Sequence, residues 1–262
     1  MTKKNKRTAG YAWSADSLKS SAEFGYASRL ASALKNALAP LVFNQYTNVL
    51  HKRLQGRITK AIGRGPEAMK GRRTLAEGDV SMLKGLELNA YTKLSALTYS
   101  LPIKVLVLAE EDALRIELQA MGPSHFRWPD RAQEAYLNVR CHVVDIQGPV
   151  VGDYVLEPRV ITKRSTGSQP QRARVETCDL ENRIVVVAVG VSFFRTDSEG
   201  YDGLISHNRK YYAAQIIEAA YVKNGKVVVF EHDDQQLSAK PPSVSTVPVI
   251  KWDEGEDTAF PL

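Results

Sequence analysis

A row of basic side chains between residues 52 and 73 is the group whose spacing points most directly to chemistry. Lys and Arg neutralise phosphates, so such a row predicts salt-sensitive nucleic-acid binding that does not depend on base sequence. No aromatic residues alternate with these charges, which disfavours stacking on a single strand. A solvated helix face is the alternative interpretation. The predicted phosphate contacts are Lys52, Arg53, Arg57, Lys60, Arg64, Arg72 and Arg73.

Residues that could catalyse a reaction or bind a metal are present, but their spacing matches no known arrangement. No two histidines are three or four residues apart, as two zinc ligands on one helix face would be. Gly63 and Gly65 precede Pro66 rather than the Gly-Lys-Ser/Thr of a phosphate loop, and no G-x-S-x-G elbow occurs. We therefore expect no enzyme, no cofactor and no metal site. The histidines are His51, His125, His142, His207 and His232.

Apolar residues recur at helical spacing in two segments between residues 17 and 62, which predicts a helical hairpin. The first helix is expected to take Ser20 or Ser21 as its N-cap, and Pro40 is expected either to end it or to start the next helix. A helix pair has two apolar sides, so one is predicted to lie on the rest of the chain and the other on a second subunit. The alternative is that both sides pack within one subunit. The predicted subunit interface is Phe24, Leu30, Leu34, Leu38, Tyr46, Leu50, Leu54 and Ile58.

Beyond residue 89 the apolar period changes from about 3.6 to 2, which predicts strands. In the run from residue 184, Val185 and Val187 lie on one face and Val186 and Ala188 on the other, so both faces require cover. Short strands without intervening helices predict an α+β chain whose residues 90–232 form an antiparallel, immunoglobulin-like β-sandwich. The predicted strands are 96–108, 113–120, 135–146, 154–163, 172–178, 184–196, 210–222 and 226–231.

The net charge of +6 is unevenly distributed along the chain. Residues 1–75 carry 15 Lys and Arg against three Asp and Glu, whereas residues 233–262 carry two basic and six acidic residues. We predict a flexible basic arm over 1–16, a helical hairpin with its connecting segment over 17–89, and a flexible acidic tail over 233–262. The arm of one subunit is expected to contact acidic residues of another. These charged residues are Lys3, Lys4, Lys6, Arg7, Asp253, Glu254, Glu256 and Asp257.

The composition is that of an ordinary globular protein. At 262 residues with 44% hydrophobic content, the chain can bury a core without covalent cross-links. Cys141 and Cys178 fall in separate predicted strands and are expected to be free thiols, with a disulfide as the alternative. No run approaches the roughly 20 apolar residues that a membrane helix needs, so we expect no membrane span and a cytoplasmic location.

Four short segments occur in a recognisable order and spacing over about residues 17–222. They are SSAEFGYAS at 20–28, GDVSMLKG at 78–85, VGVSFF at 189–194 and AAQII at 213–217. These segments resemble signatures of a mostly uncharacterised family of Bacteroidetes proteins. The resemblance implies cytoplasmic fibril proteins that build tubes or filaments in gliding bacteria, and it supplies no catalytic residues. Arg195 stands where family members carry a polar residue.

The sequence as a whole predicts a self-assembling structural protein that forms a filament, tube or shell through its N-terminal helices and charged arms. Its partner is therefore expected to be itself. One alternative is a nucleic-acid-associated protein that binds phosphates through the basic helix. Another is a ligand-binding β-sandwich whose edge carries Phe126, Trp128 and Tyr201. Exposed aromatic side chains at that edge would favour this second alternative, and buried ones would disfavour it.

Overall fold

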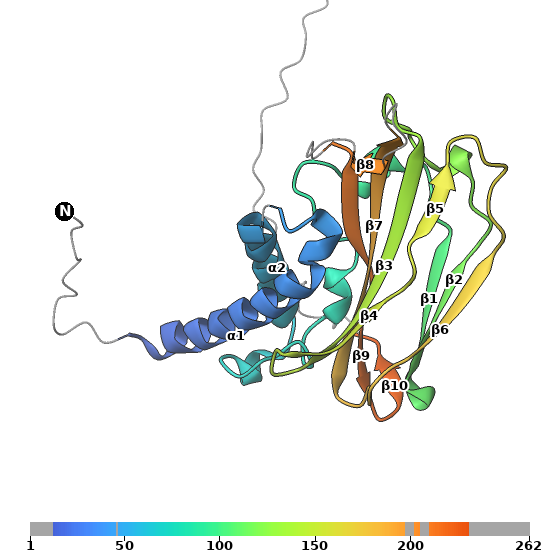
Figure 1. Cartoon of the computed structure of the whole chain (residues 1–262). Helices are drawn as coiled ribbons and strands as arrows, with labels where there is room; N and C mark the ends of the chain where they lie inside the picture. The colour runs from blue at the N-terminus through green and yellow to red at the C-terminus, as the bar shows by residue number, and fades with distance from the viewer. Residues whose placement is uncertain (1–12, 46, 197–201, 205–209, 231–262) are drawn as a thin grey trace, which may run out of the picture. The chain divides into compact units, whose positions relative to one another are not determined.

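The computed structural model describes residues 13–45, 47–196, 202–204 and 210–230. The chain divides into two units, Met1–Phe230 and Glu231–Leu262. All described residues belong to the first unit, which contains every element discussed below (Figure 1). The predicted acidic tail lies outside the described residues, and so does the basic arm except for its last four residues.

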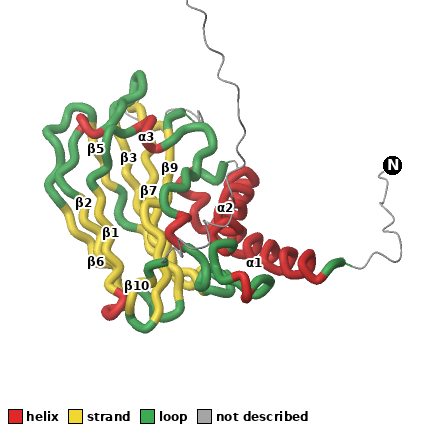
Figure 2. The backbone as a smooth tube through the Cα atoms, turned by 180° about the vertical axis from the view of Figure 1, so that it is seen from behind, coloured by secondary structure: helices red, strands yellow, loops and turns green. Residues whose placement is uncertain are grey.

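The long helices lie in the N-terminal part of the first unit, and strands predominate in the rest (Figures 1 and 2). The α-helices are α1 (Ala15–Leu38), α2 (Thr47–Ile62) and the single turn α3 (Leu94–Leu97). Short 3-10 helices are η1 (Ala39–Val42), η2 (Glu67–Met69), η3 (Val80–Leu83), η4 (Ala109–Glu111) and η5 (Pro123–His125). The strands are β1 (Ile103–Leu108), β2 (Ala113–Leu118), β3 (Glu134–Asp145), β4 (Val150–Val155), β5 (Arg159–Thr162), β6 (Gln171–Glu176), β7 (Arg183–Thr196), β8 (Asp202–Leu204), β9 (Tyr212–Lys223) and β10 (Lys226–Val228).

Helix α1 begins earlier than the sequence analysis predicted. Its N-cap is Ser14, whose hydroxyl oxygen accepts a hydrogen bond from the Ser17 amide at 3.1 Å. The cap satisfies one of the amides that the first turn leaves unpaired. Ser20 and Ser21 therefore lie inside the helix rather than at its cap, and residues 15 and 16 belong to the helix rather than to an arm.

Two strand predictions were wrong for the same reason, a proline that the apolar pattern runs across. The predicted strand 96–108 is helical in its first two residues and becomes a strand only after Pro102, as β1. The predicted strand 154–163 is interrupted at Pro158, which separates β4 from β5. Proline lacks the amide that a strand interior donates, so it lies at strand starts and edges. The remaining predicted strands agree with the observed ones within a few residues at each end.

The strands form two antiparallel sheets. The smaller sheet has the order β1-β2-β6, and the larger has the order β10-β9-β7-β3-β4. β5 also pairs with β3, and β8 pairs with β7. β3 and β7 pair continuously from Glu134 opposite Phe194 to Asp145 opposite Arg183, and this long ladder forms the centre of the larger sheet.

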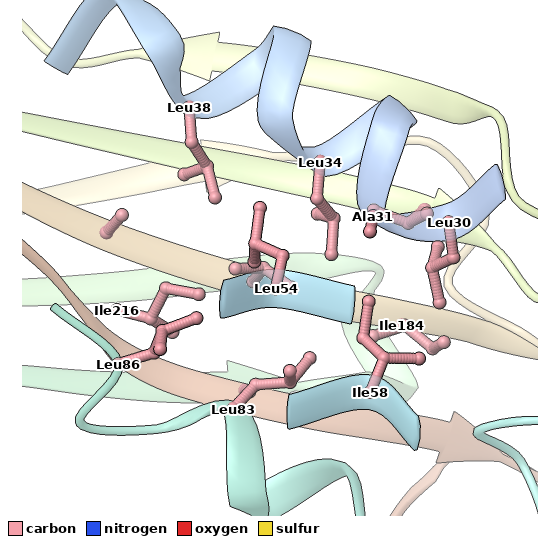
Figure 3. Close-up of a cluster of buried hydrophobic side chains, with 14 of the residues drawn as sticks. Leu30, Ala31, Leu34, Leu38, Leu54, Ile58, Leu83, Leu86, Ile184 and Ile216 are labelled. Atoms are coloured by element: carbon pink, nitrogen blue, oxygen red, sulfur yellow. The ribbon is translucent and has the colours of Figure 1, made fainter. Parts of the chain in front are cut away.

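The larger sheet has a buried core on each of its faces. Ile184, Val186 and Ala188 of β7 pack in a cluster with α1, α2 and η3 (Figure 3). Val185 and Val187 pack in a second cluster that includes the smaller sheet. Alternate residues of a strand point to opposite faces, so the predicted cover on both sides of this strand is confirmed. The helices supply one cover and the smaller sheet the other.

A β-bulge in β9 keeps both cores supplied with apolar side chains. Val187 pairs with Glu218 and Ala188 with Ile216, which leaves Ile217 as an extra residue. Before the bulge the even-numbered Ala214 and Ile216 face the helices, and after it the odd-numbered Ala219 and Tyr221 do so. One inserted residue reverses which side chains point to a given face. The bulge thus matches the register to a sequence whose alternation changes at this point.

The structure establishes an α+β chain with N-terminal helices followed by antiparallel sheets. Both cysteines are free, and Cys141 is fully buried while Cys178 is half-buried. Burial, with a smaller contribution from Asp153, raises the pKa of Cys141 to about 12. Among the helices of the described residues, none combines the length and the apolar character needed to cross a membrane.

The contact between Gly78 and α2 leads to a test of the helix layer. A Cβ at buried Gly78 would lie 2.5 Å from the Ala61 carbonyl oxygen, which is backbone and cannot rotate away. We expect Gly78→Ala to destabilise the protein by about 1–3 kcal/mol in urea unfolding. The control is Gly56→Ala in α2, where nothing lies within 4 Å. That change should stabilise by about 0.5–1 kcal/mol, and equal effects at both sites would contradict this packing.

Candidate interaction surface

The first turns of α1 extend beyond the rest of the described chain (Figures 1 and 2). Every residue from Trp13 to Ala22 is exposed. Trp13 directly precedes the N-cap Ser14, and Leu18 is the fourth residue of the helix. Apolar residues at these two positions commonly pack together as a hydrophobic staple. They are 56% and 58% exposed, and Phe24 is 58% exposed. We call Trp13, Leu18 and Phe24 the α1 tip patch.

Most of the residues predicted to contact another subunit are buried within their own. Leu30, Leu34, Leu38, Leu50, Leu54 and Ile58 are each at most 1% exposed and pack against one another and the larger sheet (Figure 3). The prediction was wrong for these six, because the strongest apolar stripe of each helix covers the sheet of its own chain. Phe24 remains exposed, and Tyr46 lies outside the described residues.

A buried ion pair holds α1 at the point where it leaves the core. Nε and Nη2 of Arg73 donate to the two carboxylate oxygens of Glu23 at 2.7 and 3.0 Å. The Gly71 amide donates to the same carboxylate at 2.7 Å, and Nη1 of Arg73 donates to the Gly65 carbonyl at 3.1 Å. One turn further along, the Tyr26 hydroxyl donates to the Ile146 carbonyl at 2.7 Å. Together these contacts make a rigid base for the exposed turns.

The electrostatics of this base follow from burial and pairing. Burial alone would raise the pKa of Glu23, but the hydrogen bonds from Arg73 and Gly71 outweigh it and hold the pKa below its ordinary value. The hydrogen bond with Glu23 raises the pKa of Arg73, against burial. Burial raises the pKa of Tyr26 to about 12. At neutral pH the carboxylate and the guanidinium are therefore both charged.

The predicted phosphate contacts do not form one exposed row. Arg73 is 6% exposed and its guanidinium is occupied, so its assignment to phosphate was wrong. Arg64 pairs with Asp79 at 3.1 Å, and Arg53 donates to the Asn89 carbonyl at 3.1 Å. The others keep a charge at the surface: Lys52, Lys60 and Arg72 are exposed, and Arg57 is half-buried. The predicted arm residues at 3–7 and 253–257 lie outside the described residues.

The predicted aromatic edge is not a ligand surface among the described residues. Phe126 is 2% exposed, and both Phe126 and Trp128 make edge-to-face contacts with Phe193. The Trp128 indole donates to the Pro123 carbonyl at 2.8 Å. These aromatic side chains complete the core between the sheets. Tyr201 lies outside the described residues.

A second apolar patch lies at the edge strand β10 of the larger sheet. Val227 and Val228 are 39% and 43% exposed, and Val229 beyond the strand is 79% exposed. They border a shallow groove of about 210 Å3 that also includes Val80, Ala219 and Tyr221. We call Val227, Val228 and Val229 the β10 patch. An exposed apolar sheet edge is a typical site of association with another chain.

Comparison with known proteins leaves the resemblance to the Bacteroidetes family as an expectation. No family model matches this chain, and no curated protein sequence is significantly similar to it. The structure nevertheless gives the residues of the resemblance physical roles. Glu23 forms the buried ion pair, Gly78 packs on α2, Asp79 pairs with Arg64, and Ile216 precedes the bulge.

The buried ion pair predicts a large difference between two neighbouring arginines. Arg73→Ala leaves the Glu23 carboxylate buried without its partner, so we expect a loss of about 3–5 kcal/mol in unfolding free energy. Arg72→Ala is the control, since Arg72 is exposed, and it should change stability by less than about 0.5 kcal/mol. Urea unfolding at neutral pH measures both, and similar losses would contradict a structural role specific to Arg73.

A second prediction concerns His142, which is fully buried on β3. Its Nδ1 lies 3.3 Å from Asp153 Oδ1, yet neither ring nitrogen makes a hydrogen bond with the described residues. Burial lowers the pKa of His142 to about 4, against the attraction of Asp153 and with the help of Arg140. The folded state therefore holds a neutral imidazole at neutral pH.

Since the folded pKa lies below the unfolded one, the unfolded chain binds the proton first as pH falls. Stability should thus decrease between about pH 6.5 and 4, by at most on the order of 3 kcal/mol from this group. Urea unfolding of the wild type and of His142→Leu across this range isolates the contribution. If the unfolding free energies of the two proteins change identically with pH, the pKa of His142 is the same in the folded and unfolded states and the prediction is wrong.

Proposed function

We propose that this chain is a structural protein that assembles with copies of itself into a filament, tube or shell. The observation that carries the proposal is the α1 tip patch, where Trp13, Leu18 and Phe24 are exposed at the end of α1 that extends beyond the rest of the described chain (Figures 1 and 2). Each of these large apolar side chains gains about 1.5–3 kcal/mol when it is fully buried, so an apolar cover would be favourable. A second subunit is the cover that we propose.

The proposed contact joins two different surfaces and therefore repeats. The α1 tip patch of one copy would pack on the β10 patch of the next, since both are exposed and apolar. A contact between unlike patches generates a ring when the rotation closes and an open helical polymer when it does not. Burial of about 800 Å2 on each partner is typical of a stable interface.

The finer parts of the prediction belong to the same proposal. They are the immunoglobulin-like character of the two sheets, the helical hairpin as the assembly element, the cytoplasmic location and the relation to fibril proteins of Bacteroidetes. The basic arm of one copy is proposed to reach the acidic tail of another. Exposed charge pairs of this kind contribute about 0–1 kcal/mol each and set register more than affinity.

The competing hypothesis is nucleic-acid binding through Lys52, Lys60 and Arg72, which remain exposed. Salt separates the two hypotheses. Phosphate contacts release counterions, so affinity for DNA or RNA should fall steeply between 50 and 200 mM salt, on the order of ten- to a hundredfold for three contacts. Assembly driven by apolar burial should persist over this range.

The assembly proposal predicts the effect of placing charge on the α1 tip patch. Leu18→Glu combined with Phe24→Glu should raise the concentration needed for assembly by at least about tenfold, because each buried apolar side chain contributes about 1.5–3 kcal/mol. Analytical ultracentrifugation and negative-stain microscopy of the full chain measure this. Ser20→Glu combined with Ser21→Glu is the matched control, since it adds the same two charges at exposed positions of the same helix.

Two results would overturn the proposal. One is a wild-type chain that stays a monodisperse monomer at high concentration in low and moderate salt. The other is a Leu18→Glu, Phe24→Glu variant that assembles as readily as the Ser20→Glu, Ser21→Glu control. Far-ultraviolet circular dichroism shows whether each variant keeps its helices, so a folding defect is not mistaken for a lost contact.

A further inference from the structure

A cavity of about 520 Å3 lies between the two sheets on the side of β5 and β6. Its floor is apolar and buried, and its rim carries the exposed Glu157, Gln171 and Arg172. A ligand site of this kind is typically a concave apolar space of 300–1,000 Å3 with a few polar groups that orient the ligand. The apolar lining residues are Ile116, Leu118, Leu137, Val139, Leu156 and Ala173.

Arg159 is the unusual member of this lining. It lies on β5 directly opposite Leu137 of β3, and residues that pair across strands point to the same face. Leu137 is 1% exposed in the core between the sheets, so the Arg159 side chain enters the same space. A charged side chain is rarely placed toward a core unless it has a partner there.

The Arg159 guanidinium is held in place but not neutralised by the groups that hold it. Nε donates to the Ser168 hydroxyl at 3.0 Å, and Nη2 donates to the Gln169 carbonyl at 2.6 Å. Both acceptors are uncharged. Ser168 is itself fixed, because its hydroxyl and its amide donate to the Met121 carbonyl at 2.7 and 2.8 Å.

The third nitrogen of this guanidinium differs from the other two. Nη1 of Arg159 is buried and has no hydrogen-bond partner among the described residues. Arg172, the other cation of the lining, differs in both respects, since its side chain is 80% exposed and its Nε lies 3.5 Å from a Glu117 carboxylate oxygen. The cavity therefore has a large apolar floor and one oriented cation in its lining. Because Nη1 has almost no accessible surface, it can donate to a ligand only after the guanidinium turns toward the cavity.

We propose that this cavity binds an apolar monocarboxylate of the medium-chain fatty-acid class. The hydrocarbon chain would lie on the floor formed by Ile116, Leu118, Leu137 and Val139, and the carboxylate would accept hydrogen bonds from Arg159. A guanidinium matches a carboxylate in charge and geometry, and the bond is strongest where water is excluded. This proposal is independent of self-assembly, because it uses neither the α1 tip patch nor the β10 patch.

An alternative role for Arg159 is protection of a sheet edge. Within the described residues, β5 pairs with β3 alone and is therefore an edge strand. An inward-pointing charge on an edge strand disfavours pairing with another chain. Edge protection requires a charge but no ligand. A direct binding experiment separates the two roles.

The test is isothermal titration calorimetry of the full chain with decanoate below its micelle concentration, compared with 1-decanol and decylamine. We expect decanoate to bind at least about tenfold more tightly than decanol, because it gains a charge-assisted hydrogen bond, and decylamine to bind most weakly. No binding of decanoate at millimolar concentration, or equal affinity for decanoate and decanol, would overturn the proposal. These comparisons need no variant.

Variants then locate the site. Arg159→Met should weaken decanoate binding by at least about tenfold and leave decanol binding nearly unchanged, whereas Arg172→Met is the matched control at the rim. Ala173→Phe should abolish binding of both ligands by filling the cavity. Unchanged decanoate affinity in folded Arg159→Met or Ala173→Phe would place the ligand elsewhere and overturn the assignment.

Discussion

The structure depends on a single constraint, which is that β7 is apolar on both faces. Paired with β3 along its length, it forms the centre of a sheet that cannot face water on either side. The helices must therefore cover one face and the smaller sheet the other. An antiparallel sheet commonly leaves one face in contact with solvent, so the double cover is a consequence of this particular sequence. Both covers are needed before the central ladder is stable.

The covers differ in extent, and this difference produces the candidate surfaces. The smaller sheet has three strands against the larger sheet, and the cavity with Arg159 lies where its edge strand β6 faces β5. On the opposite face, α1 is longer than the surface it covers, so its first turns continue into solvent. The cavity and the exposed turns of α1 both arise because the covering element and the sheet face beneath it differ in size.

Much of the fold was accessible from the sequence, because period and burial are local properties. The alternation in β7 correctly predicted that both of its faces are covered. What covers a stripe is not local: Leu30 and Leu54 require burial, but their spacing does not distinguish their own sheet from a neighbouring subunit. The role of Arg73 was hidden for the same reason, since Glu23 is fifty residues away. The earlier start of α1 could have been found, because Trp13, Ser14 and Leu18 form a staple and cap pattern.

The C-terminal part of α1 packs on the core, and its N-terminal turns extend from it. The exposed segment from Ala15 to Ala22 is about 12 Å long at 1.5 Å per residue, and the loop at residues 70–71 contacts it, since Lys70 lies 4.0 Å from Asp16 and Gly71 packs against Lys19. The strongest contacts of this end of α1 with the rest of the chain are the hydrogen bonds of Glu23 with Arg73 and of Tyr26 with the Ile146 carbonyl. These few hydrogen bonds therefore set the direction in which α1 leaves the core, whereas the exposed side chains Trp13 and Leu18 lie at least a helical turn away from them.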